Sequence, residues 1–247
     1  MKSDRRFYIS ALPALGELGL TPPVSPGWLR AHVAALPCAR ALVESVLLFD
    51  DLVQREAFLA GELPAVEPAV LTPAQARNEA PLPPHLAVAT ESGSLVSRVD
   101  GLWEAAFRHA HGVARKCGSV FLKRWVGFEV ALRNALAAAR AKRLGLDEGA
   151  FRVAADLGDP QTDLEPVLNE WSAAATPLDG LRVLIRTRWN WLTAHDAWYT
   201  FQDDELAAFA AKLALMQQWK RVVDAEEGGF PGTSADASSL SLERATG

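Results

Sequence analysis

Cysteine is scarce in this chain, and long apolar runs are absent. The only cysteines are Cys38 and Cys117, too few for a disulfide framework and too far apart for a zinc knuckle, so we expect reduced, partly buried thiols. No run of about 18 apolar residues occurs, which argues against a transmembrane helix or membrane insertion. The first residues carry positive charge, but Pro13 interrupts the apolar stretch and no convincing cleavage site follows. We therefore predict a cytoplasmic chain without a signal peptide.

Motifs of the common enzyme classes are also missing. The chain has no glycine–lysine pair and hence no phosphate-binding loop of the GxxxxGK type, and it lacks GxGxxG, GxSxG and HExxH. His109 and His111 would point to opposite sides of a helix, and the aspartates of 156–163 do not have the spacing of a calcium loop. The sequence predicts no catalytic site, no cofactor and no metal.

Positive charge is concentrated in one part of the chain. The formal net charge is −5, which argues against a general nucleic-acid-binding protein. Residues 119–144 hold six basic side chains and one acid, whereas residues 146–180 hold eight acids and one base. Two interpretations are open: the blocks pair with each other inside the fold, or they dock on a charged partner. Sequence proximity favours internal pairing.

The composition predicts an all-α fold. The chain contains 43 Ala and 34 Leu but only 2 Ile and 10 Thr, a balance typical of helices. Ser25 followed by Pro26 is a helix start, and Gly61 and Gly145 are placed to follow helix ends. Helix-capping and helix-breaking residues, together with the apolar spacing, predict helices over 28–36, 38–60, 94–116, 119–144, 166–174, 178–194 and 201–224.

Three of these segments have a clear apolar face. The face of 38–60 comprises Leu42, Val46, Phe49 and Val53; that of 119–144 comprises Phe121, Trp125, Phe128, Leu132, Ala135 and Ala139; that of 201–224 comprises Leu206, Phe209, Leu213 and Met216. The proline distribution divides the chain into an N-terminal helical part (1–60), a Pro-rich linker (61–93), a main helical bundle (94–224) and a disordered tail (225–247).

Tryptophans and clustered acids need separate consideration. Trp189 and Trp191 are two residues apart, so one of them could face the core and the other a neighbouring helix or a protein interface; core packing is the default. The acids Asp203, Asp204 and Glu205 could suggest paired catalytic carboxylates, but neighbouring acids on a helix face different directions. A helix start explains them more simply.

Three stretches of the chain resemble a family of bacterial proteins, domain-of-unknown-function family 2764. The opening FYISALPALG is similar to the family's start, with Phe7, Tyr8, Leu12, Pro13 and Leu15. The stretch GFEVALRNALAAARAKRLG resembles its helix around an Arg-Asn pair, here Arg133 and Asn134. The third stretch, 181–219, resembles its C-terminal helices, with Trp189, Trp191, Phe201, Lys212, Leu213 and Trp219.

The resemblance implies a function that the residues alone do not. Members of that family are encoded among the genes of bacterial V-type ATPases that lack an ordinary C-type subunit, the all-helical socket between the central rotor and the membrane ring. It therefore implies a non-catalytic ATPase component, built like that socket from helical bundles, here two subdomains. The component would couple the soluble head and rotor stalk to the membrane ring in proton or sodium transport.

The same resemblance implies the partners and the location. The partners would be other ATPase subunits, and the chain would associate peripherally with the inner membrane. An assembly factor or stator adaptor of the same complex is the alternative, and an enzyme with an unrecognised helical site is a further one.

Candidate contact residues follow from this hypothesis. They are the basic and amide groups of 119–144, the paired tryptophans and the acidic helix start: Arg133, Asn134, Arg140, Trp189, Trp191, Asp203, Asp204 and Glu205. The alternative is intramolecular, with Asn134 bridging to a neighbouring segment and the arginines pairing with the acids of 146–180.

Overall fold

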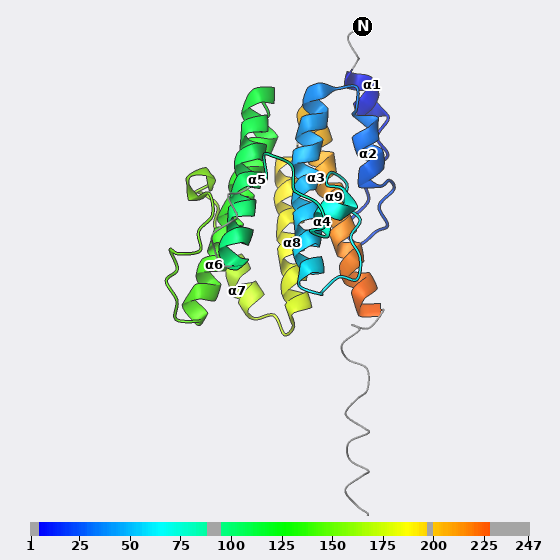
Figure 1. The fold of residues 1–247 in the computed structure, drawn as a ribbon. Coiled ribbons are helices and arrows are strands. Elements are labelled where there is room, and N and C mark those ends of the chain that lie inside the picture. Colours follow the sequence, from blue (N-terminus) through cyan, green and yellow to red (C-terminus); the bar gives the residue numbers. More distant parts are fainter. Residues whose placement is uncertain (1–4, 88–94, 197–199, 228–247) are drawn as a thin grey trace, which may run out of the picture.

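The chain folds into a bundle of helices (Figure 1). The computed structural model describes residues 5–87, 95–196 and 200–227. These residues form α-helices and one short 3₁₀ helix and no β-strand, which confirms the all-α prediction. The elements are α1 (Arg5–Ser10), α2 (Pro26–His32), α3 (Pro37–Leu59), α4 (Pro73–Ala76), α5 (Leu95–Cys117), α6 (Val120–Arg143), η1 (Ala155–Leu157), α7 (Glu165–Ser172), α8 (Pro177–His195) and α9 (Asp203–Glu227).

Five long helices make up the body of the bundle. α3 packs chiefly against α9 and α5, α5 packs against α6, and α8 packs against α9 and α7. α3 and α9 run in the same direction, whereas α5 runs opposite to both (Figure 1). As a result, the starts of α3, α6 and α9 and the ends of α5 and α8 lie at one end of the bundle, which we call the upper end after its place in Figure 1.

Local sequence signals set most helix boundaries. The Ser25 side chain accepts a hydrogen bond from the Trp28 amide at 3.1 Å, which confirms the predicted start of α2. Ser119 caps α6 in the same way, through the Leu122 amide at 3.0 Å. Between α5 and α6, Gly118 adopts a φ of 68°, and this left-handed conformation lets the chain reverse within two residues.

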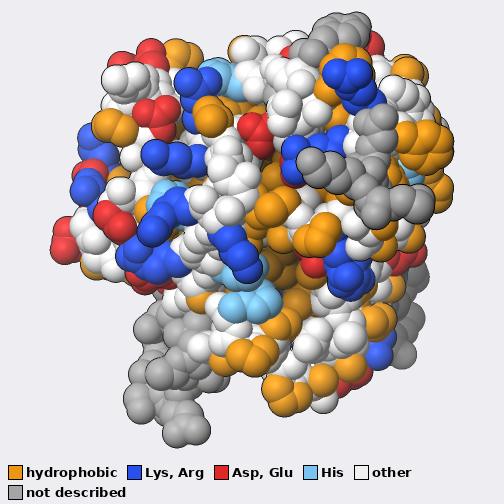
Figure 2. All heavy atoms as spheres, turned by 90° about the horizontal axis from the view of Figure 1, so that it is seen from above, with side chains coloured by type: hydrophobic (Ala, Val, Ile, Leu, Met, Phe, Trp, Pro, Cys, Tyr) orange, Lys and Arg blue, Asp and Glu red, His pale blue; other side chains and the backbone are white. Residues whose placement is uncertain are grey.

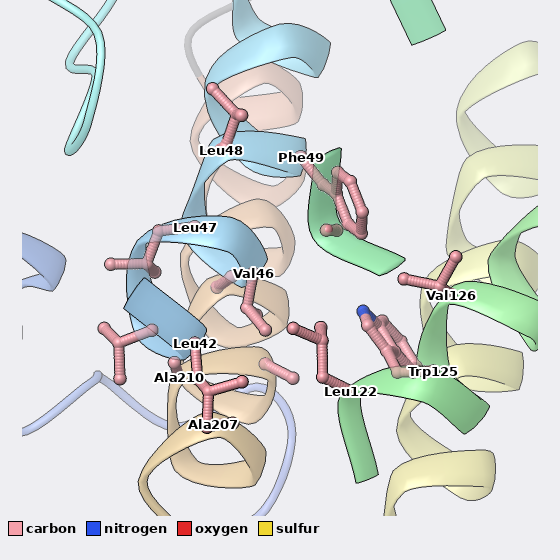
Figure 3. Packing of buried hydrophobic residues seen from close by; sticks show 14 of the residues in the cluster. Leu42, Val46, Leu47, Leu48, Phe49, Leu122, Trp125, Val126, Ala207 and Ala210 are labelled. Atoms are coloured by element: carbon pink, nitrogen blue, oxygen red, sulfur yellow. The ribbon is translucent and has the colours of Figure 1, made fainter. Parts of the chain in front are cut away.

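One cluster of buried side chains runs through the bundle, from Ile9 to Val222. Every residue from Glu205 to Met216 is buried, so the first half of α9 is enclosed on all sides. Alanines at many of these positions let neighbouring helices approach closely. Figure 3 shows α3 and α6 side chains meeting in this core, where Val46 faces Leu122 and Trp125.

The predicted apolar faces are mostly buried. The four residues proposed for 201–224 are each at most 1% exposed, and Leu42 and Leu132 are fully buried. Ala135 and Ala139 are half-buried, and Val53 is exposed, at 39%. Its 4-3-4 spacing places it on the predicted apolar face, but the buried positions around it, Asp51, Leu52, Gln54 and Arg55, lie on other sides of α3.

The described part of the Pro-rich segment, residues 61–87, is folded against α3. The Asp51 carboxylate accepts hydrogen bonds from three consecutive amides, those of Ala69 (2.8 Å), Val70 (2.7 Å) and Leu71 (2.7 Å). Arg55 donates to the Gln75 carbonyl at 2.5 Å. The helices on both sides of this segment contribute to the single buried cluster, and the division of the chain into two subdomains stays a prediction.

Two parts of the predicted organisation lie outside the described residues. These are the end of the linker, 88–93, and the tail from 228 to 247. The first three residues assigned to the tail, 225–227, are instead helical, because α9 continues to Glu227.

Candidate functional site

The predicted contact residues do not form one surface. Arg133, Asn134 and Arg140 lie in the second half of α6, whereas Asp203 to Glu205 form the first turn of α9 at the upper end of the bundle. The two tryptophans lie on the last turns of α8, which ends at the upper end of the bundle, where α9 begins (Figure 1). The structure therefore separates these residues into a lower and an upper group.

The lower group makes intramolecular contacts. The Asn134 amide donates to the Val153 carbonyl at 2.9 Å and accepts from the Val153 amide at 2.8 Å, so it bridges to the loop after α6, as the intramolecular alternative predicts. Arg133 pairs with Asp100 of α5 at 3.2 Å. The Arg140 guanidinium lies over the Trp171 ring, 5.3 Å from its centroid.

Among the described residues, no ion pair joins the basic residues of 119–144 to the acids of 146–180. Asp156 pairs with Arg108 of α5 at 3.0 Å, and Glu170 lies 3.9 Å from Arg186 of α8. Arg133 pairs with α5 instead. The prediction of internal pairing between the two blocks is wrong in this respect, because Asp156 faces α5 and Glu170 faces α8, and no ion pair between the blocks occurs among the described residues.

Both predicted tryptophans are half-buried and pack on the core. The Trp191 ring stacks on Phe128 at 5.0 Å and on His195 at 4.2 Å between centroids. Lys212 lies over the Trp189 ring at 5.7 Å. Both rings therefore pack mainly on the core, which is the default expectation.

The acidic start of α9 is used within the fold. Asp204 accepts hydrogen bonds from the Ser119 hydroxyl and, at 3.1 Å, from the Phe121 amide, so it caps the start of α6 from a neighbouring helix. Glu205 accepts from the Thr200 hydroxyl at 3.0 Å and from the Phe201 amide. Asp203 lies 3.0 Å from Arg5 of α1, and burial raises the pKa of its carboxyl. These contacts account for the three acids as structural groups, and a role in binding a partner stays a prediction.

Several polar pairs join the long helices across the interior. Glu129 of α6 is held by Arg188 of α8 through two hydrogen bonds, at 2.7 and 3.0 Å. Asp50 of α3 accepts from Gln218 at 2.9 Å and from Arg221, both on α9. Each of these carboxylates is at most a tenth exposed, so each is compensated by its partner rather than by water.

The same kind of link joins two further helix pairs. Lys212 of α9 pairs with Asp196, which follows α8, at 2.8 Å. The Trp103 indole of α5 donates to Glu56 of α3, and burial raises the pKa of that carboxyl. Sequence reasoning did not identify these pairs, because a charged residue on an amphipathic helix carries no local mark of its distant partner.

The upper end carries a surface of four basic side chains that we call the basic end surface: Arg115 and Lys116 in the last turn of α5, and Lys123 and Arg124 near the start of α6. All four are exposed, and none forms an ion pair with another described residue. Figure 2, which views the molecule from this end, shows Lys and Arg side chains gathered over its α5–α6 side. A groove of about 650 Å³ lies beside them.

Nucleophilic and metal-binding groups are not assembled at this surface. Among the described residues, no group of three His, Cys, Asp or Glu side chains is placed to hold a metal ion. Cys117 and Cys38 form a thiol pair between α5 and α3, and burial raises the pKa of Cys117 to about 12, which disfavours its thiolate. His109 stacks on His85 at 4.0 Å, and burial lowers the pKa of both imidazoles.

Comparison with protein-family models, with curated proteins and with solved structures found no match to this chain. No helix among the described residues has the length and hydropathy needed to cross a membrane. Two features are left for a functional interpretation. The long helices of the bundle are joined by polar side-chain pairs, and a basic surface lies at one end.

Proposed function

We propose that this protein is a non-catalytic subunit of a bacterial V-type ATPase. It would take the place of the C-type socket and couple the rotor stalk of the soluble head to the membrane ring in proton or sodium transport. In this role it is cytoplasmic and is held at the inner membrane by the other subunits. The resemblance to family 2764 supplies the identity of the complex, and the architecture of the bundle supports a mechanical role.

The observation that carries this proposal is the set of polar links between the long helices. Links join α3 to α9, α3 to α5, α6 to α8 and α9 to the end of α8. A buried ion pair adds little net stability compared with apolar packing, but it fixes how two helices are placed along each other. A bundle with fixed helix registers resists shear, which a part that transmits torque requires.

Affinity purification tests membership of the complex. A tagged full-length chain is recovered from detergent-solubilised membranes of its own organism, and co-purifying proteins are quantified by mass spectrometry. We expect head, stalk and ring subunits at a fixed ratio to the tagged chain. Recovery only with incomplete complexes would support the assembly-factor alternative, and recovery of no ATPase subunit from cells that express the enzyme would refute the proposal.

A second experiment tests the mechanical role. Arg188→Lys keeps the charge beside Glu129 but loses the two-point hydrogen bond. Arg186→Lys is the matched control, because Arg186 lies two residues away on α8, is exposed, and is 3.9 Å from Glu170. We expect membranes with Arg188→Lys to hydrolyse ATP with less ion pumped per ATP, while the control is unchanged. Equal coupling in both variants, with both retained in the complex, would contradict a role for this rigidity.

A further inference from the structure

The four cations of the basic end surface form no ion pair with another described residue, so their charge is not compensated within the described part of the fold. Lys123 and Arg124 follow the Ser119 cap of α6 by about one turn, where the helix dipole disfavours cations. Across the Gly118 turn, Arg115 lines the same groove as Lys123 and Arg124, and Lys116 is the next residue of α5. Like charges brought together in this way raise the free energy of the folded chain, and an anionic partner would remove that cost.

A groove gives this surface a defined shape. It lies between the α5–α6 turn and residues 157–161, and Arg115, Lys123 and Arg124 line it. Val120, also in the lining, is 58% exposed and adds an apolar contact among the cations. A ligand that combines negative charge with an aliphatic group would match both properties.

The far wall of the groove is held in place and carries one acid, Asp159. The Asp159 amide donates to the Gly127 carbonyl at 3.0 Å, which holds the loop against α6. The Asp159 carboxylate is the acid of the lining, and it accepts from the Gln161 amide and the Thr162 hydroxyl, each at 3.0 Å. No ion pair joins Asp159 to Arg115, Lys123 or Arg124 among the described residues, so the lining keeps three cations against one carboxylate.

We propose that this groove binds a carboxylate-rich segment of a partner protein, with an aliphatic side chain of that segment against Val120. A polypeptide fits better than a nucleic acid or an anionic membrane, because the cations cover only about two helical turns and the acidic segment 146–180 borders them through residues 157–161. A long phosphate backbone or a flat anionic surface would meet those acids, whereas a short segment would not. That the partner is an ATPase subunit rests on the proposed function. That the ligand is acidic and partly aliphatic rests on the groove alone.

Peptide binding by the full-length protein tests the groove directly. The probe is a short fluorescein-labelled peptide of glutamate and leucine, followed by fluorescence anisotropy at several salt concentrations. The test variant is Lys123→Glu/Arg124→Glu. The matched control is Lys142→Glu/Arg143→Glu, which makes the same charge change at two exposed positions in the last turn of the same helix.

The two double variants separate binding from folding. Acidic residues near the start of α6 favour the helix dipole, and acidic residues at its end oppose it. We therefore expect the test variant to be at least as thermally stable as the control but to bind the peptide about tenfold more weakly than wild type, with the control within about twofold. Equal weakening in both would show that net charge alone drives binding and would overturn the proposal.

Site-specific crosslinking in cells identifies the natural occupant. p-Benzoylphenylalanine replaces Val120 in the groove and, as a control, Leu144, which is 72% exposed near the opposite end of α6. We expect position 120 to capture one acidic peptide sequence and to lose it when Lys123→Glu/Arg124→Glu is added. An acidic peptide from a protein outside the ATPase would support the groove and refute the proposed function.

Other outcomes would overturn the groove assignment itself. Single-stranded DNA and phosphatidylserine vesicles are titrated alongside the peptide, and tighter, variant-sensitive binding of either would show that the surface takes phosphate-bearing ligands instead. Absence of both peptide binding and a specific crosslink at position 120 would refute the proposal.

Discussion

Replacing Asp51 with alanine should detach the segment 61–87 from α3. The Asp51 side chain is 1% exposed and is the common acceptor for the amides of Ala69, Val70 and Leu71. Alanine leaves all three N–H groups without this acceptor, and the Leu71 amide belongs to a residue that is only 4% exposed. Water therefore cannot fully take over the lost hydrogen bonds.

The expected loss scales with the number of donors. A buried N–H left without a partner costs about 1–3 kcal/mol, and two of the three amides belong to half-buried residues that water can partly reach. We therefore expect Asp51→Ala to cost about 3–5 kcal/mol, a large share of a typical total stability of about 5–15 kcal/mol. The loss can be local, in which case the segment opens while the helices stay folded.

Two measurements distinguish these results. Urea unfolding gives the global change, and hydrogen exchange of a peptide covering residues 67–72 reports local opening. Asp147→Ala is the control, since the exposed Asp147 carboxylate accepts from only the Gly149 amide, and we expect it to cost less than about 0.5 kcal/mol. The reasoning is refuted if Asp51→Ala changes the free energy of unfolding by less than about 1 kcal/mol and leaves exchange unchanged.

Further predictions concern helix ends and pH. Ser25→Ala removes the acceptor of the Trp28 amide and should lower the free energy of unfolding by about 1 kcal/mol in urea titrations. Gly118→Ala should lower the free energy of unfolding by about 1 kcal/mol, because Gly118 has a φ of 68°. Gly112→Ala, inside α5 with open space at Cβ, should raise it by about 0.5–1 kcal/mol. A loss of stability in both variants would contradict the conformational explanation. Burial outweighs three amide hydrogen bonds and raises the pKa of Asp51 from 3.8 to about 6, so the folded state takes up the proton first and stability falls as pH rises from about 4 to about 6. Between pH 5 and pH 7 wild type should lose about 1 kcal/mol relative to Asp51→Asn, measured by urea unfolding at each pH, and parallel pH profiles would show that this carboxyl does not carry the effect.

Helix identity was accessible from the sequence because the signals are local. The alanine and leucine content favours helix at nearly every position between the breaks. Ser25 marks a helix start by its side-chain cap, and Gly61 and Gly145 mark helix ends by their left-handed backbone. Apolar spacing also located the buried face of 201–224, although it did not reveal that the whole first half of α9 is buried. Periodicity describes one face, and enclosure on all sides depends on how many helices surround a segment.

The candidate site was less accessible, since it depends on what each charge meets. The cations of 119–144 were visible, and so was the choice between internal pairing and a partner. Lys123 and Arg124 looked no different from Arg133 in sequence, yet Arg133 meets Asp100 and the other two meet solvent. Arg115 and Lys116 belong to another helix and joined the surface only through the Gly118 turn.

The helices, most of their ends and the concentration of positive charge are encoded locally, because each follows from neighbouring residues and their intrinsic preferences. Which charges are compensated is a property of the folded bundle instead. Asp50 finds Arg221 on a helix far along the chain, and Asp51, the next residue, holds the Leu71 amide on another side of α3. The pairing of such groups is set by the packing of whole helices, and no local pattern in the chain encodes it.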